Sequence, residues 1–88
     1  MARIDSTEFN KKAFGFDTGR PHDFAAADYQ VFSAHTLDGK EEIILQINTY
    51  GSILRQHEGK MSQNIQIDKA LAQKLVKLFQ QYRLIEQD

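Results

Sequence analysis

Alternation between apolar and polar residues is clearest in the middle of the chain. Side chains along a β-strand point alternately to opposite faces, so apolar residues at every second position indicate a half-buried strand. Asp38-Gly39 stands between two such runs, and Asp-Gly is a preferred pair for the two-residue type I′ hairpin turn. The sequence therefore predicts a hairpin in which His35 faces Glu42 and Val31 faces Gln46.

Two further turns extend this hairpin into a predicted four-stranded antiparallel β-meander. Gly51 indicates one turn, followed by a strand at 53–57, and Glu58-Gly59 indicates the next, followed by a strand at 61–67. If each loop holds two residues, the apolar side chains stay on one face across all the strands. The predicted apolar face consists of Phe32, Ala34, Ile43, Leu45, Ile47, Leu54, Met61, Ile65 and Ile67.

An amphipathic helix is predicted after the last strand. Asp68 is a good N-cap, and residues 69–87 contain no Gly or Pro. The apolar stripe of this helix is roughly 180° wide, whereas a helix on a single sheet needs about 100°. We expect the excess to be covered by the N-terminal segment or by a second copy of the chain, and the predicted dimer interface then includes Leu71, Val76 and Phe79.

The N-terminal segment, residues 1–27, has a less regular pattern than the predicted β-meander plus helix domain, residues 28–88. Asp5 and Glu8 have the spacing of a capping box, and Gly15 could end a short helix over residues 7–14. Glycine and proline then indicate a loop. The segment contains Phe14, Phe16 and Phe24, so we expect it to pack as a lid on the core. The predicted fold class is α+β, with an irregular or short-helical N-terminal segment.

Composition narrows the class of protein. The 88 residues suit one domain, and the formal net charge of −1 gives no indication of a strongly basic nucleic-acid-binding surface. The chain has no cysteine, which excludes disulfides and thiolate metal sites. No apolar leader segment and no run long enough to span a membrane is present in the sequence. We therefore expect a cytoplasmic protein without contact to a membrane.

Signatures of catalysis are missing from the sequence. His22, His35 and His57 do not have the spacing of a metal-binding motif, and no serine lies in a nucleophile elbow. The segment from Gly15 to Gly19 lacks the spacing of a phosphate loop. We expect a protein that is not an enzyme and that binds no metal and no cofactor.

The second predicted sheet face is rich in amides and aromatic residues. Amide side chains can bind the edges of nucleic-acid bases and aromatic rings can stack on them. Tyrosine and arginine are also enriched in protein interfaces, and an ordinary solvated face is the third alternative. Cations are few, and Glu42 is predicted on this face, which weakens the case for phosphate contacts.

The order of elements resembles a known family. Asp38-Gly39-Lys40 followed by the strand at 43–47 is similar to the central hairpin of the positive-cofactor-four-like single-stranded-DNA-binding transcriptional coactivators and their bacterial relatives. The passage from Gly59-Lys60 through 65–68 to Leu71 and Leu75 resembles their transition from strand to helix. The resemblance runs from Asp28 to Gln87. It implies a dimer whose sheets hold single strands. The chain departs from the family in having fewer cations and no aromatic residue early in the helix.

These observations give a leading hypothesis and one alternative. The leading hypothesis is a single-stranded nucleic-acid-binding module, with stacking on the tyrosines, amide contacts to bases, phosphate contacts from Arg55 and Lys60, and extra charge from His57 at mildly acidic pH. The alternative is a small protein-interaction or inhibitor module that docks the same face on a larger protein. The candidate site residues are Tyr29, Gln46, Asn48, Tyr50, Arg55, His57, Lys60 and Asn64.

Overall fold

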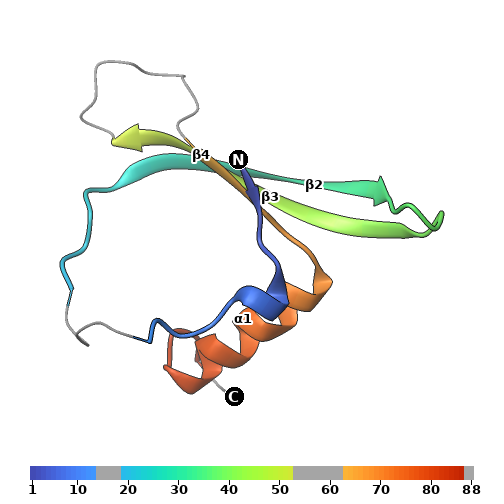
Figure 1. Cartoon of the computed structure of the whole chain (residues 1–88). Helices are drawn as coiled ribbons and strands as arrows, with labels where there is room; N and C mark the ends of the chain where they lie inside the picture. Colours follow the sequence, from blue (N-terminus) through green and yellow to red (C-terminus); the bar gives the residue numbers. More distant parts are fainter. Residues whose placement is uncertain (14–18, 53–62, 87–88) are drawn as a thin grey trace.

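The chain forms an α+β structure of one sheet and one C-terminal helix (Figure 1). The computed structural model describes residues 1–13, 19–52 and 63–86. The predicted strand at 53–57 lies outside the described residues. In chain order the elements are β1 (Ala2–Arg3), the 3-10 turn η1 (Ser6–Glu8), β2 (Ala25–His35), β3 (Glu41–Ser52), β4 (Gln63–Ile67) and α1 (Lys69–Gln81).

The sheet is mixed, so the prediction of a fully antiparallel sheet is wrong, and the predicted four-stranded meander is not confirmed. The strand order is β1-β4-β3-β2, in which β3 pairs antiparallel with both β2 and β4. The N-terminal β1 adds to the edge as a parallel strand, with Ala2 opposite Ile65, and the Ile4 N–H donates to the Gln66 carbonyl at 3.2 Å. Two residues are too few to show an alternating pattern, so the sequence could not indicate this strand.

The turn between β2 and β3 holds three residues instead of the predicted two. The Thr36 N–H donates to the Lys40 carbonyl at 2.8 Å, and the Gly39 N–H donates to the Thr36 carbonyl at 3.0 Å. Gly39 has φ 81°, the left-handed conformation of the bulge residue in three-residue hairpin loops. The Thr36 hydroxyl donates to the Asp38 carboxylate and accepts from the Lys40 N–H at 3.1 Å, which stabilises this longer loop.

Because of the extra loop residue, each side chain of β2 lies on the sheet face opposite to the predicted one. Directly opposite residues share a sheet face, and the observed pairs include Val31 with Leu45 and Phe32 with Ile44. Phe32 and Ala34 were predicted on the apolar face and lie on the other one. We define the apolar face by Tyr29, Val31, Ile43, Leu45, Ile47, Ile65 and Ile67, and the amide face by Asp28, Gln30, Phe32, Glu42, Ile44, Gln46, Asn48, Tyr50, Asn64 and Gln66.

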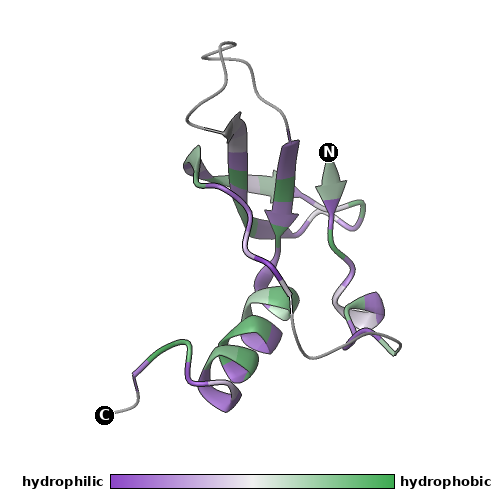
Figure 2. Cartoon of the chain, turned by 90° about the vertical axis from the view of Figure 1, so that its left-hand side faces the viewer, coloured by the Kyte–Doolittle hydropathy of each residue, from purple (hydrophilic) through white to green (hydrophobic). Residues whose placement is uncertain are grey.

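The core lies where the sheet meets the first turn of α1. Among the described residues, the buried hydrophobic side chains are Ile44, Ile67 and Leu71, with exposed fractions of 1%, 8% and 0%. Asp68 is the N-cap, as predicted, and its carboxylate accepts from the Leu71 N–H at 3.0 Å. Figure 2 shows hydrophobic and hydrophilic residues alternating along the strands and lying on different sides of the helix. The small core leaves many apolar side chains at the surface.

The helix ends earlier than the predicted residue 87. Arg83 follows the helix in the left-handed conformation, with φ 58°. The Leu84 N–H donates to the Phe79 carbonyl at 2.8 Å, and the Arg83 N–H donates to the Gln80 carbonyl at 3.3 Å. These two bonds form a Schellman motif, which usually carries glycine at the position of Arg83. Because Arg83 stands where glycine is usual, no residue type in the sequence marks the helix end.

The N-terminal segment contacts the helix as well as the sheet (Figure 1). Asp5 caps η1 by accepting from the Thr7 N–H at 2.9 Å, so the predicted helix over 7–14 is replaced by a single 3-10 turn. Lys74 donates to the Ser6 carbonyl at 3.0 Å and lies 5.9 Å from the centroid of the Phe9 ring. Phe24, predicted to be part of a lid, is 87% exposed, whereas Phe14 and Phe16 lie outside the described residues.

Candidate binding surface on the sheet

A chain of side-chain hydrogen bonds crosses the amide face from β4 to β2. Gln66 Nε2 donates to Gln46 Oε1 at 2.9 Å, and Gln46 Nε2 donates to Asn48 Oδ1 at 2.8 Å. Asn48 Nδ2 then donates to Asp28 Oδ1 at 2.8 Å, and the Tyr50 hydroxyl donates to Asp28 Oδ2 at 2.7 Å. We call these five residues the amide ladder.

The carboxylate of Asp28 sets the direction of the ladder. An ionised carboxylate only accepts hydrogen bonds, so Asn48 must turn its NH₂ group toward Asp28. Its Oδ1 atom therefore faces Gln46, which must in turn donate from its own NH₂ group. The same reasoning fixes Gln66 as the donor to Gln46. Each amide orientation follows from the one before it.

The hydrogen bonds to Asp28 also shift proton affinities. The bond from the Asn48 amide, followed by the bond from the Tyr50 hydroxyl, lowers the pKa of the Asp28 carboxyl. The same contact raises the pKa of the Tyr50 hydroxyl, because the phenol proton is held by a carboxylate. Asp28 is thus ionised at neutral pH and Tyr50 keeps its proton.

Strand register explains why these residues meet. Asn48 lies opposite Asp28 on one side and opposite Asn64 on the other, while Gln46 lies between Gln30 and Gln66. Asn48 and Asn64 are the buried polar residues of the described chain, with exposed fractions of 6% and 9%. Asn48 on β3 and Asn64 on β4 are therefore covered, Gln46 is half-buried, and Gln30 on the edge strand is exposed.

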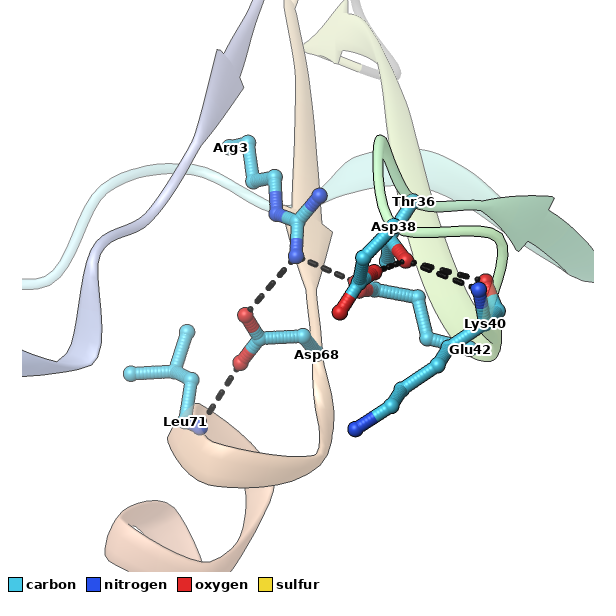
Figure 3. A network of polar contacts seen from close by, with 7 residues as sticks. All are labelled: Arg3, Thr36, Asp38, Lys40, Glu42, Asp68 and Leu71. Atoms are coloured by element: carbon cyan, nitrogen blue, oxygen red, sulfur yellow. Dashed lines mark hydrogen bonds and ion pairs between the residues drawn. The ribbon is translucent and has the colours of Figure 1, made fainter.

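A second polar cluster closes the end of the amide face near the helix (Figure 3). Arg3 on β1 donates to the carboxylate of Glu42 and to Asp68 Oδ2 at 3.1 Å. The contact with Asp68 is the main reason for the raised pKa of Arg3. The pKa of Asp68 is lowered, first by the Leu71 N–H that it caps and also by Arg3. The charge of Glu42 is therefore balanced by Arg3, whereas Asp28 is held by neutral donors.

The structure gathers part of the predicted site. Gln46, Asn48 and Tyr50 belong to one hydrogen-bonded group, and the register places Asn64 beside Asn48. Tyr29 lies on the apolar face, opposite Ile47, and is 73% exposed. It was predicted on the same face as Tyr50 because the predicted loop was one residue too short. The predicted residues Arg55, His57 and Lys60 lie outside the described residues.

The predicted dimer interface on the helix is split by burial. Leu71 is fully buried within the single chain, so it has no surface left for a partner. Val76 is 46% exposed and Phe79 is half-buried. The part of the apolar helix stripe that stays exposed includes Ala72 and Val76. These two residues line a shallow groove together with other residues of α1.

Sequence reasoning missed Asp28 and Arg3 as parts of polar clusters. Asp28 is the first residue of the predicted β-meander domain and has no motif around it. With a three-residue turn, counting back from Gly39 would have placed it opposite Asn48, so the signal existed only with the correct turn. Arg3 belongs to the strand that the pattern could not show.

Two general features limit the chemistry of the described residues. Within residues 1–13, 19–52 and 63–86, no group of three or more His, Cys, Asp or Glu side chains is arranged to hold a metal ion. No helix in the same residues is long and apolar enough to cross a membrane. The comparisons add no relative, since the chain matches no protein-family model, no curated protein and no solved structure.

Proposed function

We propose that the chain is a binding module without enzymatic activity that holds single-stranded nucleic acid on the amide face. The amide ladder is the observation that carries this proposal. Gln46 and Gln66 each use one N–H of the NH₂ group within the ladder, so each carries a second N–H that the ladder does not use. Both side chains are half-buried, and exposed Gln30 stands next to Gln46. Oriented amides can form paired hydrogen bonds with adenine and other base edges.

Charge determines which part of a nucleic acid would face the ladder. Phosphates are repelled by the Asp28 carboxylate, whose hydrogen-bond donors in the described part of the chain are the neutral Asn48 and Tyr50 side chains. Bases, in contrast, offer both acceptors and donors to the amides. We therefore expect contacts to unpaired bases, with the phosphates turned outward, and tighter binding to single strands than to a duplex of the same sequence.

Fluorescence anisotropy with labelled single-stranded oligonucleotides at low salt tests this proposal. Gln30→Glu adds a negative charge on the amide face and should weaken binding severalfold, because an added carboxylate repels the nucleic acid. Gln73→Glu on α1 is the matched control, since it makes the same chemical change at an exposed helix position. Absence of binding at high micromolar protein, or equal loss in both variants, would contradict the proposal.

The charge of Asp28, which forms no ion pair within residues 1–13, 19–52 and 63–86, favours a second candidate, in which the same face docks on a basic surface of a larger protein. Arginine and lysine side chains could reach the Asp28 carboxylate and the acceptor atoms of the amides. Gln30→Glu separates the candidates by the sign of its effect. It should weaken binding of an oligonucleotide and strengthen binding of an arginine-rich probe peptide, measured in the same anisotropy assay.

A further inference from the structure

The outer edge of β2 is an open strand edge. β2 lies at the end of the strand order and pairs only with β3 in the described part of the chain. It runs for 11 residues along the margin of the sheet (Figure 1). The opposite margin is different, because β1 covers part of β4 there.

The hairpin bonds show which backbone groups of β2 face outward. The Thr36 N–H points to β3, since it donates to Lys40. The N–H and C=O groups of successive residues point to opposite sides of an antiparallel strand. The backbone groups that bond to β3 are therefore also those of Asp28, Gln30, Phe32 and Ala34. The N–H and C=O groups that point away from the sheet therefore belong to Ala27, Tyr29, Val31, Ser33 and His35.

The edge lacks the usual features that prevent strands from pairing. Proteins protect long edges with proline, with lysine, with bulges or with a covering element. From Ala27 to His35 the sequence contains no proline, lysine or arginine, and the register irregularity lies before it, between Ala25 and Ala27. Every residue from 25 to 31 is exposed. This edge is built like one that pairs with another strand.

We propose that β2 pairs antiparallel with β2 of a second copy of this chain across a two-fold axis. A two-fold interface needs a surface that is complementary to itself, and an antiparallel edge meets this need because it offers the same N–H and C=O pattern in both directions. The alternation of outward N–H and C=O groups allows the two-fold axis to pass at Gln30 or at Val31, so that this residue faces the same residue of the second copy. In the second case Val31 lies opposite the partner's Val31 and Tyr29 opposite the partner's Ser33.

Charge supports a second copy as the occupant. Asp28 is the one acidic residue in β2, and like charges directly opposite each other destabilise a strand pair. With the axis at Gln30, Asp28 faces the partner's Phe32, and with the axis at Val31 it faces the partner's Ala34. Neither arrangement brings the two carboxylates opposite each other. The outward-facing backbone positions carry no acidic or basic side chain other than His35.

Burial supports it as well. The Cα radius of gyration is 15.7 Å, whereas a compact domain of this length has about 12 Å. Tyr29 and Val31 are 73% and 58% exposed although they lie on the apolar face. Pairing of the β2 edges places the Tyr29 and Val31 side chains of both copies next to one another on a continuous apolar face. The second copy therefore covers apolar surface that the single chain leaves in water.

Light scattering coupled to size-exclusion chromatography, over a range of concentrations of the full chain, tests the proposal. The wild type should shift from monomer to dimer mass as the concentration rises. Val31→Pro removes an outward N–H without removing a bond to β3, and it should stay monomeric at the concentration where the wild type is dimeric. Val31→Thr is the matched control, because it keeps the N–H and the β-branched shape, and it should dimerise.

Single cysteine variants report the register, since the chain contains no cysteine. Under mild oxidation a disulfide should form between copies of Gln30→Cys or of Val31→Cys, depending on which residue lies on the axis. Lys77→Cys on the exposed side of α1 is the control and should remain uncrosslinked. These variants decide the question even if Val31→Pro does not fold.

Three outcomes would overturn the proposal: a monomer at every concentration, a Val31→Pro variant that dimerises as well as the wild type, or crosslinking that is equal at Lys77→Cys. A monomer that captures an extended peptide along β2 also overturns it, because the occupant is then another protein. None of these measurements uses an oligonucleotide. Failure of the dimer therefore leaves the proposed role of the amide face to its own test.

Discussion

Asp28 and Asn48 lie directly opposite each other on β2 and β3, and the Asn48 amide donates to the Asp28 carboxylate at 2.8 Å. The pair joins the edge strand to the buried middle of the sheet, since Asn48 is only 6% exposed. The contact between Asp28 and Asn48 depends on the length of the turn between β2 and β3, which follows Thr36, eight residues after Asp28. A shift of one residue in that turn would move the two side chains to different faces.

Replacement of Asn48 should destabilise the fold. Asn48→Leu removes one hydrogen-bond partner from Asp28 and one from Gln46, and it should lower the free energy of unfolding by about 1–3 kcal/mol. Asn48→Asp should cost at least as much at pH 7, because it brings a second carboxylate opposite Asp28. Urea unfolding gives both values. Exposed Asn10→Asp is the control and should change stability by less than about 0.5 kcal/mol; an Asn48→Asp variant as stable as this control at pH 7 would refute the role given to the pair.

The stability of the chain should depend on pH through Asp68. Its pKa is lowered in the folded state, first by the Leu71 N–H and also by Arg3, so its stabilising effect is present above its unfolded-state pKa of about 3.9. The effect is lost as the pH falls through the lower folded-state pKa. Asp68→Ala should cost about 1 kcal/mol at pH 7 and reduce the loss of stability in acid.

Asp68→Asn separates capping from charge. Asparagine is a good N-cap but has no titrating carboxyl, so this variant should keep most of the stability at pH 7 and also lose less in acid. Thermal unfolding from pH 2 to pH 7 measures all three proteins. An unchanged acid dependence in both variants would show that other carboxylates, such as Asp28, dominate it.

Gly39 should be sensitive to substitution for a reason of backbone conformation alone. A Cβ atom added there meets nothing within 4 Å, but φ is +81°. Gly39→Ala should therefore cost about 1 kcal/mol. Gly39→Asn should cost less, because asparagine tolerates the left-handed region. Chemical unfolding distinguishes the two, and equal stabilities would argue against the three-residue turn.

Arg83 offers the opposite case. It occupies the left-handed position after α1 with φ 58°, where glycine carries no steric penalty. Arg83→Gly should raise the free energy of unfolding by about 0.5–1 kcal/mol. Gly at the neighbouring exposed helix position, Gln81→Gly, is the control and should destabilise by a similar amount. If both variants changed the free energy of unfolding in the same direction, the observed helix end would be contradicted.

Leu71 should be the most costly position of the helix. It has no exposed surface, so Leu71→Ala should lower the free energy of unfolding by about 2–5 kcal/mol. Val76→Ala is the control on the outer side of the same helix, where the side chain is 46% exposed, and it should cost clearly less. Denaturant midpoints measured by circular dichroism compare the two. A larger effect at Val76 would mean that the outer side is the buried one.

The strongest local signals in the sequence predicted the elements correctly. The helix after Asp68 has a good cap and a long apolar period, and its start is confirmed. The hairpin around Asp38-Gly39 exists, but the pair is compatible with both a two-residue and a three-residue loop, and the observed bonds of Thr36 decide between them. That single ambiguity moved Tyr29 away from Tyr50 and concealed the contact of Asp28 with Asn48.

The remaining differences arise from contacts between distant parts of the chain. β1 is defined only by its pairing with β4, and the cluster of Arg3 with Glu42 and Asp68 depends on that pairing. Neither local propensity nor periodicity contains this information. Gln46, Asn48 and Tyr50 were recognised as a group because residues two apart on a strand share a face, which holds whatever the register to the neighbouring strand.

The parallel pairing of β1 with β4 also sets the order in which the chain can be completed during synthesis. Ala2 lies beside Ile65 in the finished sheet, so the residues of β1 leave the ribosome long before β4, the strand with which they pair, has been made. At about 5–20 residues per second this interval lasts several seconds. During it, the edge of β4 that β1 will cover does not yet exist, so the β2–β3 hairpin is synthesised before β4 and β1 can join the sheet.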